Sequence, residues 1–139
     1  MCIKIDLDYL KGLLEAFEAS SEPTTDIEQL KDAGFDYNDK LFIFHMRILA
    51  DRNLVEQPDG EFGFGAILGV DGQISWSVLP LRLTSAGHEF VAALKNKEVW
   101  EKIKTNFKDG SINTILDISK RLLEAYSIKK LGQLIGANG

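Results

Sequence analysis

The Asp71-Gly72 pair is the feature of this sequence that most constrains the fold, because Asp-Gly is a strong two-residue hairpin signal. The segments on either side, residues 61–70 and 73–83, are predicted as the two strands of that hairpin. The periodic segments before and after them have helical spacing. One antiparallel hairpin therefore interrupts an otherwise helical chain.

The register of a two-residue turn determines which side chains share a face of the hairpin. A two-residue turn at Asp71-Gly72 would place Ile67 opposite Trp76 and Gly65 opposite Val78. Trp76 would then lie over glycine backbone that carries no side chain. The other face would bury apolar side chains near the base of the hairpin, Phe62 among them, and the tip would be exposed.

Each predicted helix starts at a residue type that can cap it. The candidate caps are Asp6, Thr25 or Asp26, Asn38 or Asp39, Thr84, Asn96 and Ser111. Three helices, a hairpin and further helices form the order of a winged helix-turn-helix domain. We expect an α+β, winged-helix-like fold in residues 1–108 and a C-terminal helical extension in residues 109–139. The extension would pack on the domain or form a homodimer contact through residues 111–135.

Composition limits the class of protein. The chain has 139 residues, of which 45% are hydrophobic, and no apolar run long enough to span a bilayer. One cysteine and two histidines exclude a disulfide framework and a four-ligand zinc site, and we expect no cofactor. The first residues turn acidic at once and lack a secretory apolar stretch, so we expect a cytoplasmic protein.

Two segments carry a resemblance to known proteins. Residues 82–90 read Arg-Leu-Thr-Ser-Ala-Gly-His-Glu-Phe, and Trp100 follows. This is similar to an uncharacterised family of small bacterial and phage proteins with an Arg-Leu-Thr-x-x-Gly-His-Asp/Glu-Phe motif after a wing. Residues 45–55 resemble the end of a winged-helix recognition helix, with Arg52-Asn53 where Ala-Gly is usual. The resemblance implies a fold and no activity.

Charge is distributed unevenly along the chain. Residues 1–60 contain 6 Lys or Arg and 13 Asp or Glu, whereas residues 61–139 contain 10 and 8. From Asn53 to Leu81, a stretch that covers all but the last two residues of the predicted hairpin, there is no Lys or Arg. Because proteins bind polyanions by replacing counterions with lysine and arginine, these patterns disfavour nucleic acid as the ligand.

The third predicted helix begins with four consecutive apolar residues, Leu41 to Phe44. At about 100° per residue they surround the helix, so its outer side is either covered or an exposed apolar patch. Our main hypothesis is therefore a non-enzymatic interaction or regulatory protein that acts through protein contacts. The candidate interface residues are Ile43, Phe44 and Trp76.

Two alternatives remain open at this point. A DNA-binding regulator of phage or mobile-element type would contact phosphates through Lys40, His45, Arg47, Arg52, Lys102 and Lys104. A small phage-encoded inhibitor would instead mimic nucleic acid with the acidic surface of residues 1–60. An enzyme is disfavoured, because Cys2 has no evident activating base and the glycine-rich residues 60–65 lack the lysine of a phosphate loop.

Overall fold

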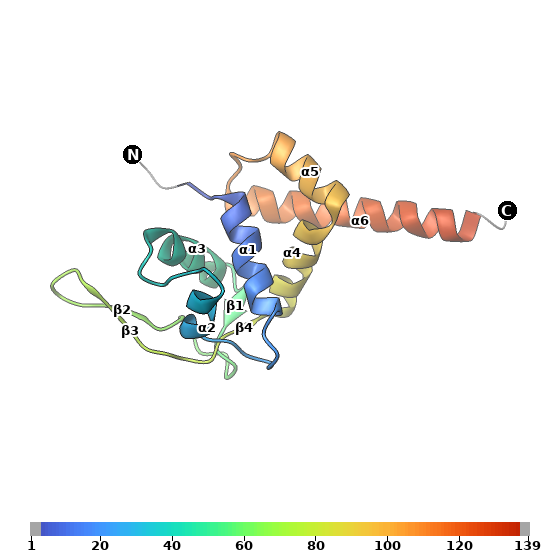
Figure 1. The fold of residues 1–139 in the computed structure, drawn as a ribbon. Coiled ribbons are helices and arrows are strands. Elements are labelled where there is room, and N and C mark those ends of the chain that lie inside the picture. The colour runs from blue at the N-terminus through green and yellow to red at the C-terminus, as the bar shows by residue number, and fades with distance from the viewer. Residues whose placement is uncertain (1–3, 137–139) are drawn as a thin grey trace. The chain divides into compact units, whose positions relative to one another are not determined.

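Figure 1 shows a computed structural model of the protein, in which residues 4–136 are described. Over these residues the fold is α+β, with six helices and two small antiparallel sheets. The chain divides into two compact units, the first ending at His88 and the second beginning at Glu89. Cys2, which we considered as a nucleophile, lies outside the described residues.

The three helices of the first unit begin at aspartate caps. Helices α1 (Leu7–Glu18), α2 (Ile27–Asp32) and α3 (Lys40–Asp51) follow Asp6, Asp26 and Asp39, whose carboxylates accept backbone N–H bonds of the first turn. The predicted caps are thereby confirmed. They supply acceptors to N–H groups that have no partner inside a helix.

The four strands of the first unit are short. Strand β1 (Val55–Glu56) pairs with β4 (Arg82–Leu83), and β2 (Ala66–Leu68) pairs with β3 (Ile74–Trp76), in both cases antiparallel. An isolated bridge joins Thr25 to Leu81, just before β4. The ends of the hairpin are thus joined to the segments that precede α2 and follow α3.

The hairpin register differs from our prediction by one residue. Trp76 pairs with Ala66, not Ile67, because the loop has three residues, Val70 to Gly72, between Gly69 and Gln73. Gly72 adopts a positive φ of 80° and the Asp71 carboxylate accepts the N–H of Gln73 at 3.0 Å. Such three-residue loops are a common alternative to the two-residue turn. The one-residue shift reverses the faces that we expected for one strand relative to the other.

The core of the first unit lies between α1, α2, α3 and the base of the hairpin. Leu10, Met46 and Leu81 have no exposed surface, and Phe64 is buried. Phe62, which we placed with them, is 74% exposed, so that prediction was wrong. Residues 62 and 64 are separated by Gly63 at φ 104°, which breaks the alternation that a regular strand would impose.

The second unit contains most of helix α4 (Ser85–Lys95) together with α5 (Lys97–Asn106) and α6 (Ile112–Gly136). Thr84, Asn96 and Ser111 cap these helices as predicted. Helix α5 packs on α6 within this unit. Val99, Ile103 and Ile115 are buried in this unit.

Two glycines of the hairpin, Gly63 and Gly65, allow a matched test of how closely the two hairpin backbones approach each other. Gly63 (φ 104°) and Gly65 (φ 99°) both adopt conformations unfavourable to other residues, but only at Gly65 would an added Cβ lie 2.2 Å from the Ser77 carbonyl oxygen. We expect Gly63→Ala to lower the free energy of unfolding by roughly 1–2 kcal/mol, and Gly65→Ala to lower it by more. Urea unfolding measures both values, and equal losses would contradict the close approach of Gly65 to Ser77.

Candidate functional site

Trp76 attaches the hairpin to the rest of the first unit. Its ring centroid lies 5.3 Å from that of Tyr37, 5.8 Å from that of Phe42 and 6.0 Å from that of Phe64. These separations are typical of favourable aromatic pairs. Trp76 is half-buried, and much of its surface is used within the unit. This candidate interface residue therefore positions the hairpin beside α3.

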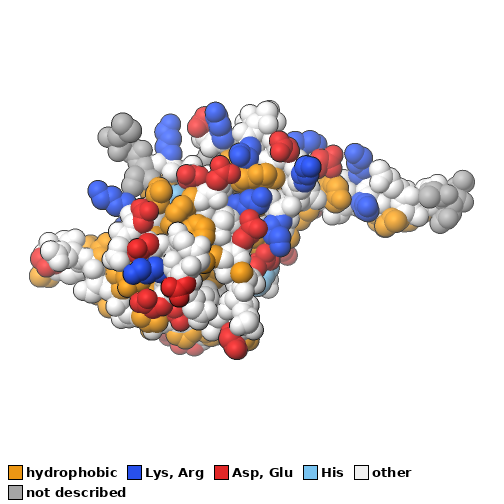
Figure 2. Space-filling model, viewed as in Figure 1, with side chains coloured by type: hydrophobic (Ala, Val, Ile, Leu, Met, Phe, Trp, Pro, Cys, Tyr) orange, Lys and Arg blue, Asp and Glu red, His pale blue; other side chains and the backbone are white. Residues whose placement is uncertain are grey.

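A groove of about 420 Å³ lies between α3 and the hairpin. Helix α3 contributes Arg47, Ala50 and Asp51 to its lining, and the hairpin side contributes Phe62, Leu68 and Ile74, among others. Phe62 is 74% exposed and Leu68 is 66% exposed. The groove thus has apolar walls and one charge of each sign on its helical side. In Figure 2, apolar side chains are visible on the hairpin at the left of the molecule.

The outer face of α3 combines apolar and charged side chains. Ile43 and Phe44 are half-buried, whereas Lys40 and Arg47 are exposed. Phe44 contacts the ring of His45 edge-on, with ring centroids 5.1 Å apart. The two apolar candidates are therefore neither fully inside the core nor fully exposed, and they lie between cations on the same helix.

His45 is fully buried and occupies a structural position. Its Nε2 accepts the backbone N–H of Asp6 at 3.0 Å, and its Nδ1 lies 2.8 Å from the Leu41 carbonyl oxygen, to which it donates. This pattern requires the neutral ring protonated at Nδ1. His45 joins α3 to the start of α1 and presents no surface to a phosphate.

The remaining nucleic-acid candidates fall into separate groups. Lys40, Arg47 and Arg52 are exposed, and among residues 4–136 none of them forms an ion pair. In the second unit, Lys102 lines a hollow between α5 and α6, whereas the Lys104 amine lies 5.4 Å from the centre of the Trp100 ring. Two residues apart on a helix, these lysines point in nearly opposite directions, and the structure does not bring them together.

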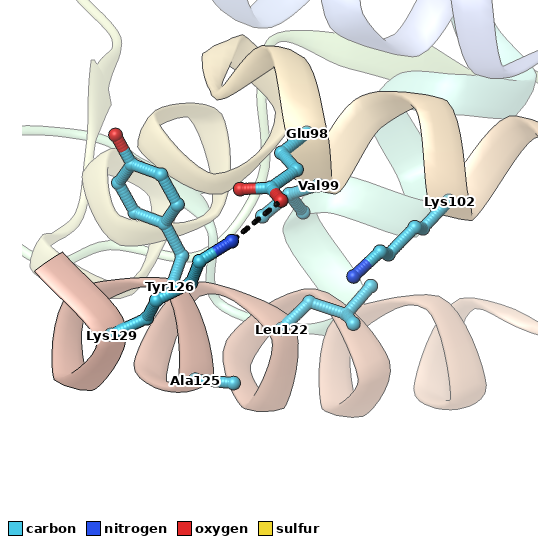
Figure 3. A pocket seen from close by; sticks show the side chains of 7 residues that line it. All are labelled: Glu98, Val99, Lys102, Leu122, Ala125, Tyr126 and Lys129. Carbon is cyan, nitrogen blue, oxygen red and sulfur yellow. Dashed lines mark ion pairs between the residues drawn. The ribbon is translucent and has the colours of Figure 1, made fainter.

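Figure 3 shows the hollow between α5 and α6, whose volume is about 110 Å³. Val99, Leu122 and Ala125 contribute apolar surface to it. The Lys129 amine lies 3.7 Å from a carboxylate oxygen of Glu98 and connects the two helices. A space this small suits a few waters better than a substrate.

The segment that carries the motif 82–90 has a structural role at the start of α4. The Arg82 guanidinium contacts the Glu56 carboxylate at 2.7 Å. The Thr84 hydroxyl donates to the Asn53 carbonyl at 2.6 Å and accepts the N–H of Gly87. A Cβ on Gly87 would lie 2.2 Å from the Leu54 carbonyl oxygen, so this position requires glycine. The motif therefore fixes β1, β4 and α4 together, and it does not form the groove.

Sequence reasoning missed most of the groove. We expected Phe62 in the core, and Leu68 and Asp51 were not among the predicted site residues. The available signal was that residues 67, 68, 70 and 74 are all apolar on a hairpin whose short strands cannot bury both faces. Without the docking position of Trp76, nothing in the sequence indicates which of them line a groove.

The comparisons with known proteins identify a family. Residues 4–113 match the model of the family described as "Hypothetical protein (DUF2513)", and the chain belongs to that family. It is also 24% identical over 122 residues to an "Uncharacterized protein" of Haemophilus influenzae, a match that covers 88% of this chain and 93% of the relative. The family is of unknown function, as the resemblance implied. No solved structure matches the chain.

The described residues hold neither a metal-binding group of side chains nor a membrane-spanning helix. Among residues 4–136, no three His, Cys, Asp or Glu side chains are grouped so that they could hold a metal ion. Within the same residues, no helix has both the length and the apolar character that a membrane crossing requires.

The buried position of His45 makes the stability of the fold depend on pH. Burial lowers the pKa of His45 below its ordinary value of 6.5, although the hydrogen bond to Leu41 and the charge of Asp6 oppose this shift. The unfolded chain therefore binds a proton more readily, and stability falls as pH decreases through 6.5 toward the folded pKa. We expect a lower urea midpoint below pH 6.5 than above it, and a smaller difference in His45→Leu.

The other histidine supplies the control. His88 is exposed, and we expect His88→Gln to retain the pH dependence of the original protein. An unchanged pH dependence in His45→Leu would contradict the role assigned to the buried ring.

Proposed function

We propose that the protein is a non-enzymatic protein-binding module, and that the groove between α3 and the hairpin receives a segment of a partner protein. The observation that carries this proposal is the exposure of large apolar side chains around the groove. Phe62 and Leu68 are 74% and 66% exposed, and Ile67 nearby is 55% exposed. Apolar groups gathered at a concave surface are typical of sites that bind proteins.

The charges beside the groove indicate what the partner segment carries. Arg47 lines the groove, and Lys40 lies two turns away on the same face of α3. Asp51 is the acidic residue of that face. Two exposed cations against one carboxylate favour a segment with one or two large apolar side chains and a neighbouring Asp or Glu. Burial of the apolar side chains would supply affinity, and the carboxylate would set orientation.

The strand connections support a winged-helix-like reading of the first unit. The Thr25–Leu81 bridge and the β1–β4 pairing place the segment 81–83 between residues that precede α2 and residues that follow α3. That connection, together with the hairpin after the third helix, is what a winged helix requires. On this reading the groove lies between the recognition helix and the wing.

A peptide selection tests the proposal. We expect peptides selected from a displayed library against the full chain to share apolar residues and an adjacent Asp or Glu. Phe62→Asp and Leu68→Asp should each weaken their binding at least about tenfold, which corresponds to about 1.4 kcal/mol. Fluorescence anisotropy with a labelled selected peptide measures the change, and circular dichroism checks that each variant is folded.

Val78 provides a matched control for that experiment. It is 55% exposed and follows β3, but it does not line the groove, so Val78→Asp should leave the affinity unchanged. Peptides that bind the original protein and the two groove variants equally would contradict the proposal.

A second candidate function, DNA binding by a regulator of phage or mobile-element type, is favoured by one observation. Lys40, Arg47 and Arg52 are exposed on or next to α3 and form no ion pair among the described residues. Against it, residues 1–88 carry 7 Lys or Arg and 15 Asp or Glu, so the unit repels a polyanion overall. A DNA-binding protein of this kind would hold random duplex DNA and lose it on Lys40→Glu combined with Arg47→Glu.

The same charge imbalance favours a third candidate, a small inhibitor that mimics nucleic acid. Exposed acidic side chains occur on and around α2, including Glu28, Asp32 and Asp39. Such an inhibitor would bind a protein that itself handles nucleic acid, and duplex DNA would compete with it for that protein. Binding that persists in saturating duplex would exclude this candidate.

A further inference from the structure

Strand β2 has one edge whose backbone groups face no other strand. Among residues 4–136, β2 pairs with β3 alone in a two-stranded sheet. The Ser77 N–H donates to the Gly65 carbonyl at 2.8 Å, which directs the Gly65 backbone toward the β3 side. Antiparallel strands exchange hydrogen bonds at alternate residues, so Ala66 and Leu68 direct their N–H and C=O groups away from β3. We call these groups the open edge of β2.

The groove of the first unit runs along this open edge. Most of its hairpin lining comes from residues 62–68, on and just before β2, whereas β3 contributes Ile74. On the β3 side, the ring of Trp76 packs against Tyr37 and Phe42. Figure 1 shows β2 as the strand of the hairpin that lies nearer to α3. A ligand in the groove therefore meets backbone donors and acceptors of β2 as well as apolar side chains.

The side chains at the open edge are apolar on both faces of the hairpin. Leu68 lines the groove and is 66% exposed, whereas the neighbouring Ile67 points to the opposite face and is 55% exposed. A helix in the groove would cover Leu68 and leave Ile67 exposed. A strand added beside β2 would place side chains next to both, because cross-strand neighbours meet on each face of a sheet. The exposure of these consecutive residues favours an extended ligand.

The sequence of this edge does not block strand pairing. Natural proteins commonly protect an exposed edge strand with lysine, proline or an inward-pointing charge. Residues 62–70 contain no charged residue and no proline. The open edge of β2 can therefore accept a further strand.

We propose that the partner segment binds as an extended strand that pairs with the open edge of β2, an inference that rests on the proposed function of the groove. Its backbone exchanges hydrogen bonds with Ala66 and Leu68, and its alternate side chains enter the groove. The segment carries apolar side chains at positions i and i+2 and an Asp or Glu within reach of Arg47. That arginine lines the groove and forms no ion pair within residues 4–136.

Charge favours a different protein over a second copy of this chain as the source of the strand. Residues 62–70 of a second copy would bring no carboxylate to Arg47. Pairing of two β2 edges would also bring together two copies of the first unit. Residues 1–88 of each carry 7 Lys or Arg and 15 Asp or Glu, so their net charges would repel each other.

Hydrogen exchange of the full chain, followed by NMR with and without a saturating selected peptide, tests the pairing on the protein side. In the free protein we expect the amides of Ala66 and Leu68 to exchange quickly, and the amide of Ile67, which faces Ser75 on β3, to exchange slowly. The peptide should slow exchange at Ala66 and Leu68 by at least about tenfold. Unchanged exchange at both residues in the complex would overturn the proposal. Exchange that slows with protein concentration alone would assign the edge to a second copy and would also overturn it.

Backbone methylation of the same peptide tests the pairing on the ligand side. N-Methylation removes a donor, so it should weaken binding at least about tenfold at the residues that face β2, and little at the residues between them. Fluorescence anisotropy measures both effects. Equal tolerance at every position, or loss at every position in peptides with apolar residues at i, i+3 and i+4, would overturn the strand pairing and leave the groove as the binding site. Peptides insensitive to Phe62→Asp and Leu68→Asp would instead contradict the proposed function, and the strand pairing with it.

Discussion

The docking of Trp76 is the interaction on which the architecture of the first unit depends. A two-stranded hairpin with three residues in each strand has little stability in isolation. The β1–β4 pairing and the Thr25–Leu81 bridge hold its base, and one indole ring that packs against Tyr37 and Phe42 holds its strands beside α3. Because Phe42 belongs to α3, the same contact determines the distance between the hairpin and that helix. We therefore expect the shape of the groove to depend on this contact.

That arrangement explains why apolar side chains remain exposed. Trp76 and Phe64 use the inner side of the hairpin, and the strands are too short to bring Leu68 and Ile67 into the same core. Large apolar side chains that are exposed beside a concave surface are stabilised when another molecule covers them. In the proposed function, the α3 cations, which form no ion pair within residues 4–136, would orient that molecule, and the net charge of residues 1–88 would discourage a polyanion.

Local features of the fold could be predicted from the sequence, because they depend on neighbouring residues. The helix caps at Asp6, Asp26 and Ser111 were found correctly, since capping requires only a short side chain before an amphipathic segment. The hairpin register was predicted wrongly, because Asp71-Gly72 fits a two-residue loop and a three-residue loop equally well. The packing of α5 on α6 could not be predicted from the sequence, because it depends on which apolar faces meet in the folded chain.

The candidate site was predicted only in outline. Of the candidate interface residues Ile43, Phe44 and Trp76, none lines the groove, whereas Arg47, a candidate only for nucleic acid, does. The sequence could not show that His45 is held by the Asp6 backbone, or that Phe62 leaves the core after Gly63. Both depend on contacts between residues far apart in the chain, which spacing alone does not reveal.

Nuclear Overhauser contacts of the Trp76 indole in the full chain, measured by NMR in solution, test the central claim most directly. The account predicts cross-peaks from this ring to the rings of Tyr37, Phe42 and Phe64, together with slowed exchange of the Ser77 amide, which donates to the Gly65 carbonyl. A Trp76 ring without contacts to Phe42, on a hairpin whose amides exchange as fast as an unfolded chain, would contradict it.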